Sequence, residues 1–81
     1  MDLLDTVELM SSADFKDRFK AEYYQTKIRY EKLHKMVVKY EAGTLEFEPN
    51  CSLELLKAQE SVMRSYLYML EMRAEIEKIA L

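Results

Sequence analysis

Residues 19–40 read FKAEYYQTKIRYEKLHKMVVKY, and the spacing of the apolar and aromatic side chains in this stretch decides the fold. Successive members lie alternately four and three residues apart, which is the spacing of a helix that packs along one seam. The stretch predicts a long helix, which we place at residues 14–42, with Ser11 and Ser12 as candidate N-caps. The predicted seam consists of Phe19, Tyr23, Thr26, Tyr30, Leu33, Val37 and Tyr40.

A second helix is expected after a single break in the pattern. Gly43 suits the left-handed position that ends a helix, and Ser52 suits the N-cap of the next, with Glu54 in its first turn. The connecting residues 43–52 are long enough to reverse the chain, and we expect Leu45 and Phe47 to tuck over that end. The second helix is predicted at residues 53–80, with a seam of Leu56, Gln59, Met63, Tyr66, Leu70 and Arg73.

The fold class that follows is all-α. Residues 1–12 carry a few leucines and a valine, and we expect them to form a short helical segment packed across the helices. The low content of glycine and proline, one residue of each, favours long uninterrupted helices. The sequence therefore predicts one domain over residues 1–81, an antiparallel two-helix hairpin with a short N-terminal helical segment.

Each predicted helix carries a second apolar stripe. In a two-helix hairpin each helix has one neighbour and buries roughly one face, so these stripes are surplus. The N-terminal segment is large enough to cover one of them and too small to cover both. We therefore expect a homo-oligomeric helical bundle, which also suits a chain too short to build a large core alone. The surplus residues are Phe15, Tyr24, Ile28 and Met36, then Leu55, Val62, Met69 and Ile76.

Composition argues against several classes of protein. Cys51 is the only cysteine and His34 the only histidine, so neither a disulfide nor a structural zinc site is expected. No apolar run is long enough for a membrane span, and we expect a soluble cytoplasmic protein. No phosphate-binding loop or nucleophile motif is present. We therefore expect no enzyme activity, no cofactor and no metal, with His34 as a solvated surface residue.

The charge is unevenly distributed. The net charge of −3 argues against a protein that binds long nucleic acids, but residues 14–42 hold eight Lys or Arg against five Asp or Glu. Lys27, Arg29 and Lys32 interleave there with tyrosines, and cations with aromatic rings can hold a small phosphorylated ligand where two chains meet. The alternative is a solvated face beside a tyrosine-rich core. Arg73, at a seam position, needs either a carboxylate or a ligand anion as partner.

The seam residues also carry a resemblance to a known family. The chain resembles the helical hairpin of phage anti-CBASS cyclic-nucleotide sponges, which anti-Thoeris sponges share as a domain and to which small proteins of crAss-like phages are related. The resemblance covers residues 15–76, with Thr26, Arg29 and Met36 standing where the family pattern has Leu, Lys and Phe. It is carried by Arg18, Phe19, Glu22, Arg29, Leu33 and Val37, then by Leu55, Leu56, Gln59, Met63, Tyr66, Leu70 and Arg73.

The resemblance implies a function and a set of ligand-binding residues. Sponges of this type form trimers and hexamers that bind cyclic di- or trinucleotides in the host cytoplasm without cleaving them, which deprives a host defence effector of its signal. An aromatic residue and a cation of the first helix share one pocket, which implies Phe15 and Arg29. An arginine of the second helix serves another pocket, which implies Arg73. Lys27 and Lys32 are added as candidates from the charge pattern alone.

Two other functions remain open at this point. The acidic surface of the loop, the second helix and the N-terminal segment suits a phage inhibitor that binds a host defence complex, as anti-CRISPR proteins do. A purely structural helical assembly protein is the other alternative. Ligand binding discriminates the sponge from both.

Overall fold

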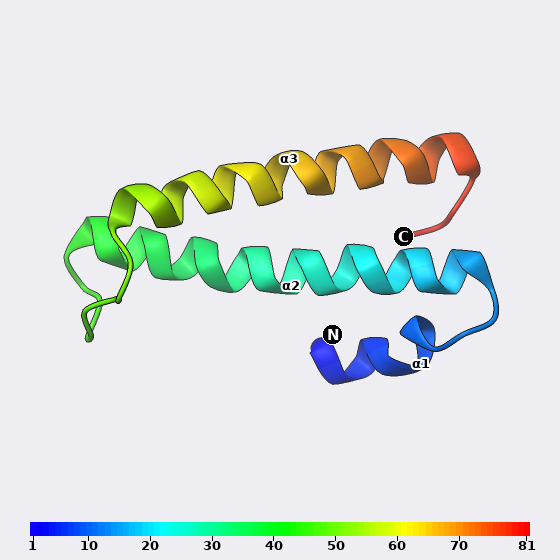
Figure 1. Cartoon of the computed structure of the whole chain (residues 1–81), viewed down its shortest axis with the longest axis horizontal. Helices are drawn as coiled ribbons and strands as arrows, with labels where there is room; N and C mark the ends of the chain where they lie inside the picture. Colours follow the sequence, from blue (N-terminus) through cyan, green and yellow to red (C-terminus); the bar gives the residue numbers. More distant parts are fainter.

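The computed structural model describes all 81 residues, and it contains helices and connecting turns but no strand. A 3₁₀ helix, η1 (Leu3–Thr6), runs directly into the single-turn helix α1 (Val7–Met10). The long helices are α2 (Phe15–Ala42) and α3 (Leu53–Glu77), and they lie side by side (Figure 1). The all-helical class predicted from the sequence is confirmed. No helix is both long enough and apolar enough to cross a membrane.

Local sequence fixes both ends of α2. The carboxylate of Asp14 accepts a hydrogen bond from the Lys16 backbone N–H at 2.9 Å, so Asp14 is the N-cap. The prediction of Ser11 or Ser12 as the cap is wrong, because the Ser12 hydroxyl bonds Asp14 and Asp17 instead. At the other end Gly43 takes a left-handed φ of 76°, as predicted, which a glycine adopts without steric cost.

The start of α3 is as predicted, but its end is not. The Ser52 hydroxyl accepts a hydrogen bond from the Leu55 N–H at 3.2 Å. The helix ends at Glu77, three residues before the predicted boundary, because Lys78 takes a left-handed φ of 58°. This turn directs Ile79 back onto the helix pair, where it is buried and donates to the Ala74 carbonyl at 2.9 Å. Burial of one more apolar side chain thus accounts for the early stop.

Three contacts define how α2 and α3 pack. The Tyr23 hydroxyl donates to Glu71 at 2.6 Å, Arg64 donates to the Tyr30 hydroxyl at 3.0 Å, and Lys57 pairs with Glu41 at 3.2 Å. Rising numbers on α2 meet falling numbers on α3, so the helices run in opposite directions. The molecule measures 43 × 25 × 16 Å, and the main buried cluster lies where α2 begins and α3 ends. It contains Phe19, Tyr23, Leu67, Leu70, Ala74 and Ile79.

The seam predicted for α2 is confirmed, whereas the seam predicted for α3 is wrong at three positions. Every predicted seam residue of α2 is buried or half-buried. On α3, Gln59, Tyr66 and Arg73 are exposed. Residues 56, 63 and 70 are common to two possible heptad patterns. The predicted pattern adds residues 59, 66 and 73, whereas the chain buries residues 60, 67 and 74. The observed pattern buries more apolar surface. The observed seam is Leu53, Leu56, Glu60, Met63, Leu67, Leu70 and Ala74.

The N-terminal segment covers one side of α2. The Gln25 amide donates to the hydroxyl of Thr6 at 2.9 Å, and Thr6 is fully buried. Ala21, one turn before Gln25 on the same face, is also buried. The segment therefore packs against the face of α2 that carries Ala21 and Gln25, while Phe15 of the surplus stripe stays 48% exposed.

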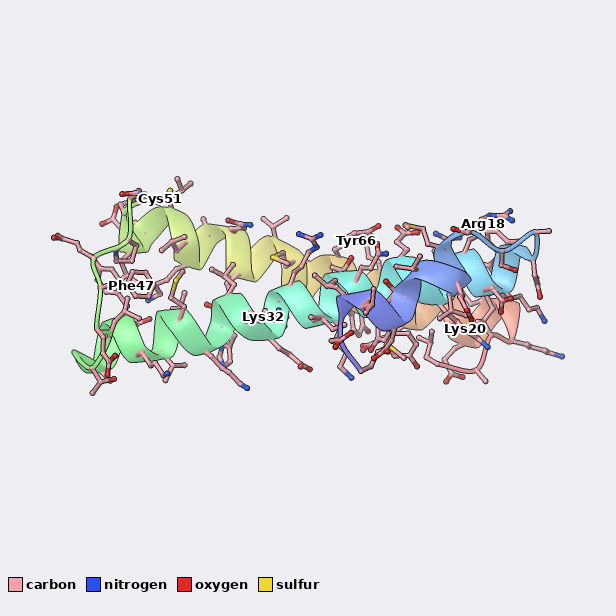
Figure 2. The ribbon with its side chains drawn as sticks, turned by 90° about the horizontal axis from the view of Figure 1, so that it is seen from below. Arg18, Lys20, Lys32, Phe47, Cys51 and Tyr66 are labelled. Carbon is pink, nitrogen blue, oxygen red and sulfur yellow. The ribbon has the colours of Figure 1, made fainter.

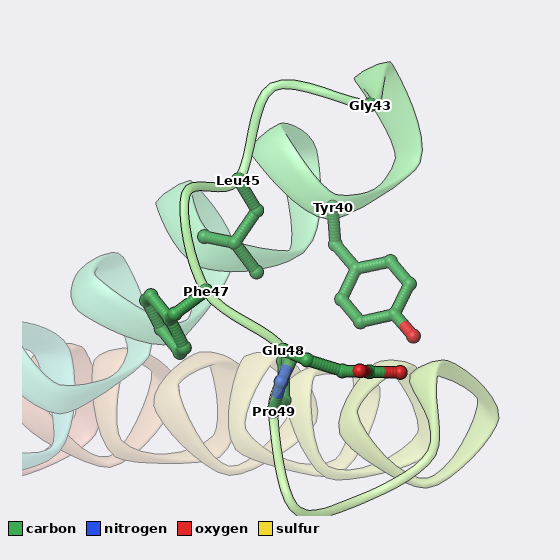
Figure 3. Close-up of a pocket in the computed structure, with 6 residues that line it drawn as sticks. All are labelled: Tyr40, Gly43, Leu45, Phe47, Glu48 and Pro49. Carbon is green, nitrogen blue, oxygen red and sulfur yellow. The ribbon is translucent and has the colours of Figure 1, made fainter.

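The connection between α2 and α3 is only partly tucked in. Leu45 is half-buried against the helix end, but Phe47 is 60% exposed, so the prediction that both side chains tuck in is wrong for Phe47. Figure 3 shows Leu45, Phe47 and Tyr40 around a small hollow of about 160 Å³ at this end of the molecule. The loop has too few apolar residues to fill this hollow.

Candidate functional site

A line of exposed side chains runs along α3 from one end to the other. It consists of residues 55, 59, 62, 66, 69, 73 and 76, which alternate four and three apart and are all exposed. We call this line the outer stripe; its members are Leu55, Gln59, Val62, Tyr66, Met69, Arg73 and Ile76. Such spacing is that of a helix that packs against another helix, and no helix of this chain covers it. The sequence analysis assigned residues 59, 66 and 73 to the seam and residues 55, 62, 69 and 76 to a surplus stripe. In the structure all seven lie on one exposed face.

The polar residues of the family pattern on α2 lie beside the outer stripe. Arg18, Glu22 and Arg29 are exposed and share one face of α2, since residues four, seven and eleven apart align on a helix. Figure 2 shows Arg18 and Tyr66 at the same long edge of the helix pair, with Lys20 at the opposite edge. We call this edge, together with the outer stripe, the motif face.

Phe15 and Arg73 both lie against Phe19 at one end of the motif face. The guanidinium of Arg73 lies over the Phe19 ring at 4.9 Å, and the Phe15 ring lies 6.2 Å from that of Phe19. A guanidinium over an aromatic face is held by electrostatic attraction. Its Nε also donates to Glu77 at 3.1 Å, whereas its two terminal nitrogens have no partner in the chain. Arg73 is therefore oriented by a ring and a carboxylate, with one edge free for an anion.

Arg29 lies on the motif face but far from Phe15. Fourteen residues separate them on one helix, or roughly 21 Å at 1.5 Å per residue. Arg29 and Lys32 are exposed and neither pairs with a carboxylate. Lys32 is three residues further on, about 60° around the helix from Arg29 and away from α3. A single chain therefore does not gather the residues that the sequence singled out.

Lys27 lies on the opposite side of the helix pair from Arg29. Two residues along a helix correspond to about 200° of rotation. Its ammonium group is 5.9 Å from the centre of the Tyr23 ring, and it lines a groove with Tyr30 and Arg64. The interleaved lysines and tyrosines recognised in the sequence thus divide between two faces.

A buried carboxylate network was missed by sequence reasoning. Glu60 is 6% exposed at a seam position of α3, where it contacts His34 Nδ1 and the Arg64 guanidinium. His34 is exposed, as predicted, but its Nδ1 also contacts this buried carboxylate. The signal was available in part, since Arg64 follows Glu60 at the i,i+4 spacing of a helical ion pair.

The Tyr23 hydroxyl is the most perturbed acid in the chain. Burial, together with the hydrogen bond to Glu71 and the charge of that carboxylate, raises the pKa of Tyr23 to about 12. All three causes disfavour the phenolate. Tyr23 is therefore a neutral donor that ties α2 to α3, not an acid–base group near neutral pH.

The side chains gathered on the motif face are suited to binding an anion. No three His, Cys, Asp or Glu side chains gather in a way that would hold a metal ion. Cys51 is exposed in the loop, while Nδ1 of the single histidine is held by Glu60. The motif face instead combines free guanidinium edges, an aromatic ring and an apolar stripe, which suits the binding of an anionic ligand between packed helices.

The family model described as Sequestin matches residues 13–76, which span the whole of α2 and α3 as far as Ile76. No curated protein and no solved structure matches the chain.

Proposed function

The chain belongs to the Sequestin family, and from this premise we propose that it is a phage anti-defence sponge, which sequesters a cyclic oligonucleotide signal in the host cytoplasm without cleaving it. The family name itself suggests sequestration. One observation carries the rest of the proposal: the polar residues of the family pattern and the exposed apolar stripe occupy the same face of the helix pair.

The binding site is formed between chains. Phe15 and Arg29 are too far apart on α2 for a single small ligand, so a pocket that uses both takes them from different copies. The outer stripe can join these copies, because its apolar members are exposed in one chain and have the spacing of a helix–helix seam. A closed homo-oligomer, a trimer or a hexamer of this helix pair, follows from such repeated contacts.

The ligand is a cyclic di- or trinucleotide. Such a molecule carries two or three phosphates and as many flat bases, and it needs cations and aromatic surfaces that are spread over several copies. Arg29 and Arg73 bind phosphates, each in its own pocket, and Phe15 stacks on a base. Lys32 points away from this face and is left outside the proposed site. Retention without cleavage requires no nucleophile or metal.

Thermal denaturation with a panel of cyclic di- and trinucleotides tests the proposal. A sponge is stabilised by its own ligand, by roughly 2.7 kcal/mol at a hundredfold excess over Kd, whereas the linear dinucleotide of the same bases gives a smaller shift. The absence of a shift with every cyclic nucleotide would reject the sponge. Copurification of a stoichiometric host protein in that case would support a protein-binding inhibitor.

A further inference from the structure

The side of the molecule opposite the motif face holds a groove that the proposed sponge site does not use. It has a volume of about 280 Å³ and runs between α2 and α3 over the buried Tyr23 and Leu67. Tyr30, Tyr68 and Arg64 form its walls together with Lys27. All of these residues belong to one chain, so the groove is complete without a second copy.

The walls of the groove are fixed before any ligand arrives. Tyr23 is bonded to Glu71 at 2.6 Å, and Arg64 is bonded to Tyr30 at 3.0 Å and to Glu60 at 3.1 Å. The Arg64 guanidinium also lies 5.7 Å from the centre of the Tyr30 ring. The bonds of Tyr23 to Glu71 and of Arg64 to Tyr30 join the two helices, and the bond of Arg64 to Glu60 holds the guanidinium within α3. A preformed site loses little conformational entropy on binding.

Three groups in the groove have unused binding capacity. Tyr68 is 62% exposed, and its ring and hydroxyl have no partner in the chain. Lys27 has no carboxylate within ion-pair distance. Glu31 is exposed and accepts no hydrogen bond from another side chain. The groove thus offers a stacking face, a cation and a free acceptor side by side.

We propose that this groove is a second ligand site, which binds a single nucleotide whose base carries an exocyclic amino group. The ring stacks on Tyr68, and the amino group donates to Glu31. The phosphate is held by Lys27 and by Nη1 of Arg64, the one guanidinium nitrogen that bonds neither Tyr30 nor Glu60. Two cations and two carboxylates line the groove, so a ligand with both a phosphate and amino donors is complementary, whereas a bare anion is not.

Size separates this site from the proposed sponge site. A volume near 280 Å³ lies just below the roughly 300–1,000 Å³ of ligand pockets, which suits one nucleotide rather than a cyclic dinucleotide or trinucleotide. The stoichiometry is one nucleotide per chain. The proposal does not depend on the sponge function, and either can fail without the other.

NMR titration of the full ¹⁵N-labelled chain with AMP tests the site, with IMP, adenosine and inorganic phosphate as comparison ligands. AMP is expected to shift the amides of Lys27, Arg64 and Tyr68 with saturation at one per chain. IMP lacks the amino group, adenosine lacks the phosphate, and each is expected to bind about tenfold more weakly. No saturable shift with AMP, or shifts confined to the motif face, would overturn the site. Equal binding of adenosine or IMP would overturn the assigned chemistry.

Matched variants locate the binding groups. Lys27→Gln and Tyr68→Ala are each expected to raise the Kd for AMP by about tenfold, while Lys35→Gln removes an exposed lysine outside the groove and leaves it unchanged. All three side chains are exposed, so the variants keep the fold, which circular dichroism verifies. An unchanged Kd in both groove variants would refute the proposal. Saturation of the chain with a cyclic dinucleotide should leave AMP binding intact.

Discussion

A charge placed in the outer stripe should dissociate the oligomer. Val62→Glu introduces a carboxylate near the middle of the stripe, at a position that is 68% exposed in the single chain. In a bundle that buries this stripe, the new carboxylate would face apolar side chains of another copy. The perturbation therefore acts on association between chains and leaves the α2–α3 seam untouched.

The size of the effect follows from the exposed fractions. The four aliphatic members of the stripe, Leu55, Val62, Met69 and Ile76, are 59, 68, 54 and 79% exposed. At about 1.5–3 kcal/mol for each fully buried side chain, their burial contributes roughly 4–8 kcal/mol per copy. Val62→Glu removes about 1–2 kcal/mol of this and adds several kcal/mol for an unpaired buried carboxylate. A loss near 4 kcal/mol raises the dissociation constant about a thousandfold.

Light scattering coupled to size exclusion measures the result. The natural chain is expected to elute with the mass of a trimer or hexamer at micromolar concentration, and Val62→Glu with the mass of a monomer. Ser61→Glu is the matched control, because it adds the same charge one residue away, about 100° around the helix. A natural chain that is already monomeric, or a Val62→Glu variant of unchanged mass, would refute the role of the outer stripe.

Three further predictions concern the network, the arginines and the buried tyrosine. In urea denaturation at fixed protein concentration, Glu60→Leu should raise the free energy of unfolding or leave it unchanged, because the partners of Glu60 are half-exposed and regain water. Glu60→Ala leaves a cavity and should lower the free energy of unfolding by about 1–3 kcal/mol. Equal effects of the two variants would contradict this reasoning. Arg29→Gln and Arg73→Gln should each weaken cyclic-nucleotide binding about tenfold or more without changing the oligomer mass; dissociation instead of weaker binding would assign them to the interface. The pKa of Tyr23 is raised to about 12 from 10, so its contribution to stability is complete below pH 10 and is lost as the pH rises to 12. Tyr23→Phe should remove this part of the pH dependence of unfolding. An unchanged alkaline unfolding profile in Tyr23→Phe would contradict this role of Tyr23.

Most of the architecture could be predicted because it depends on local signals. The heptad spacing from Phe19 to Tyr40, the left-handed Gly43 and the Ser52 cap each act over a few residues, and each prediction is confirmed. The seam of α3 was not accessible in the same way. Two heptad patterns share Leu56, Met63 and Leu70, and only packing against α2 decides which additional residues are buried.

The candidate site was predicted less well, because it depends on contacts between distant residues. Lys27 and Arg29 are two residues apart, so a helix places them on opposite sides. The position of α3 then shows that Lys27 lines the groove and that Arg29 lies on the motif face. The stacking of Arg73 on Phe19 was likewise invisible, since it joins residues 54 positions apart. Glu60 was not singled out from the sequence, because only the observed seam of α3 places it in the interior.

The most direct test of the sponge is to recover its ligand. The purified chain is loaded with the cyclic nucleotide that gives the largest thermal shift, passed over a desalting column, heat-denatured, and the released nucleotide is identified by chromatography and mass spectrometry. The sponge predicts that the intact cyclic molecule co-elutes with the protein and is recovered unaltered in a fixed ratio to the chain. Recovery of linear or hydrolysed products, or of no nucleotide at all, would contradict sequestration.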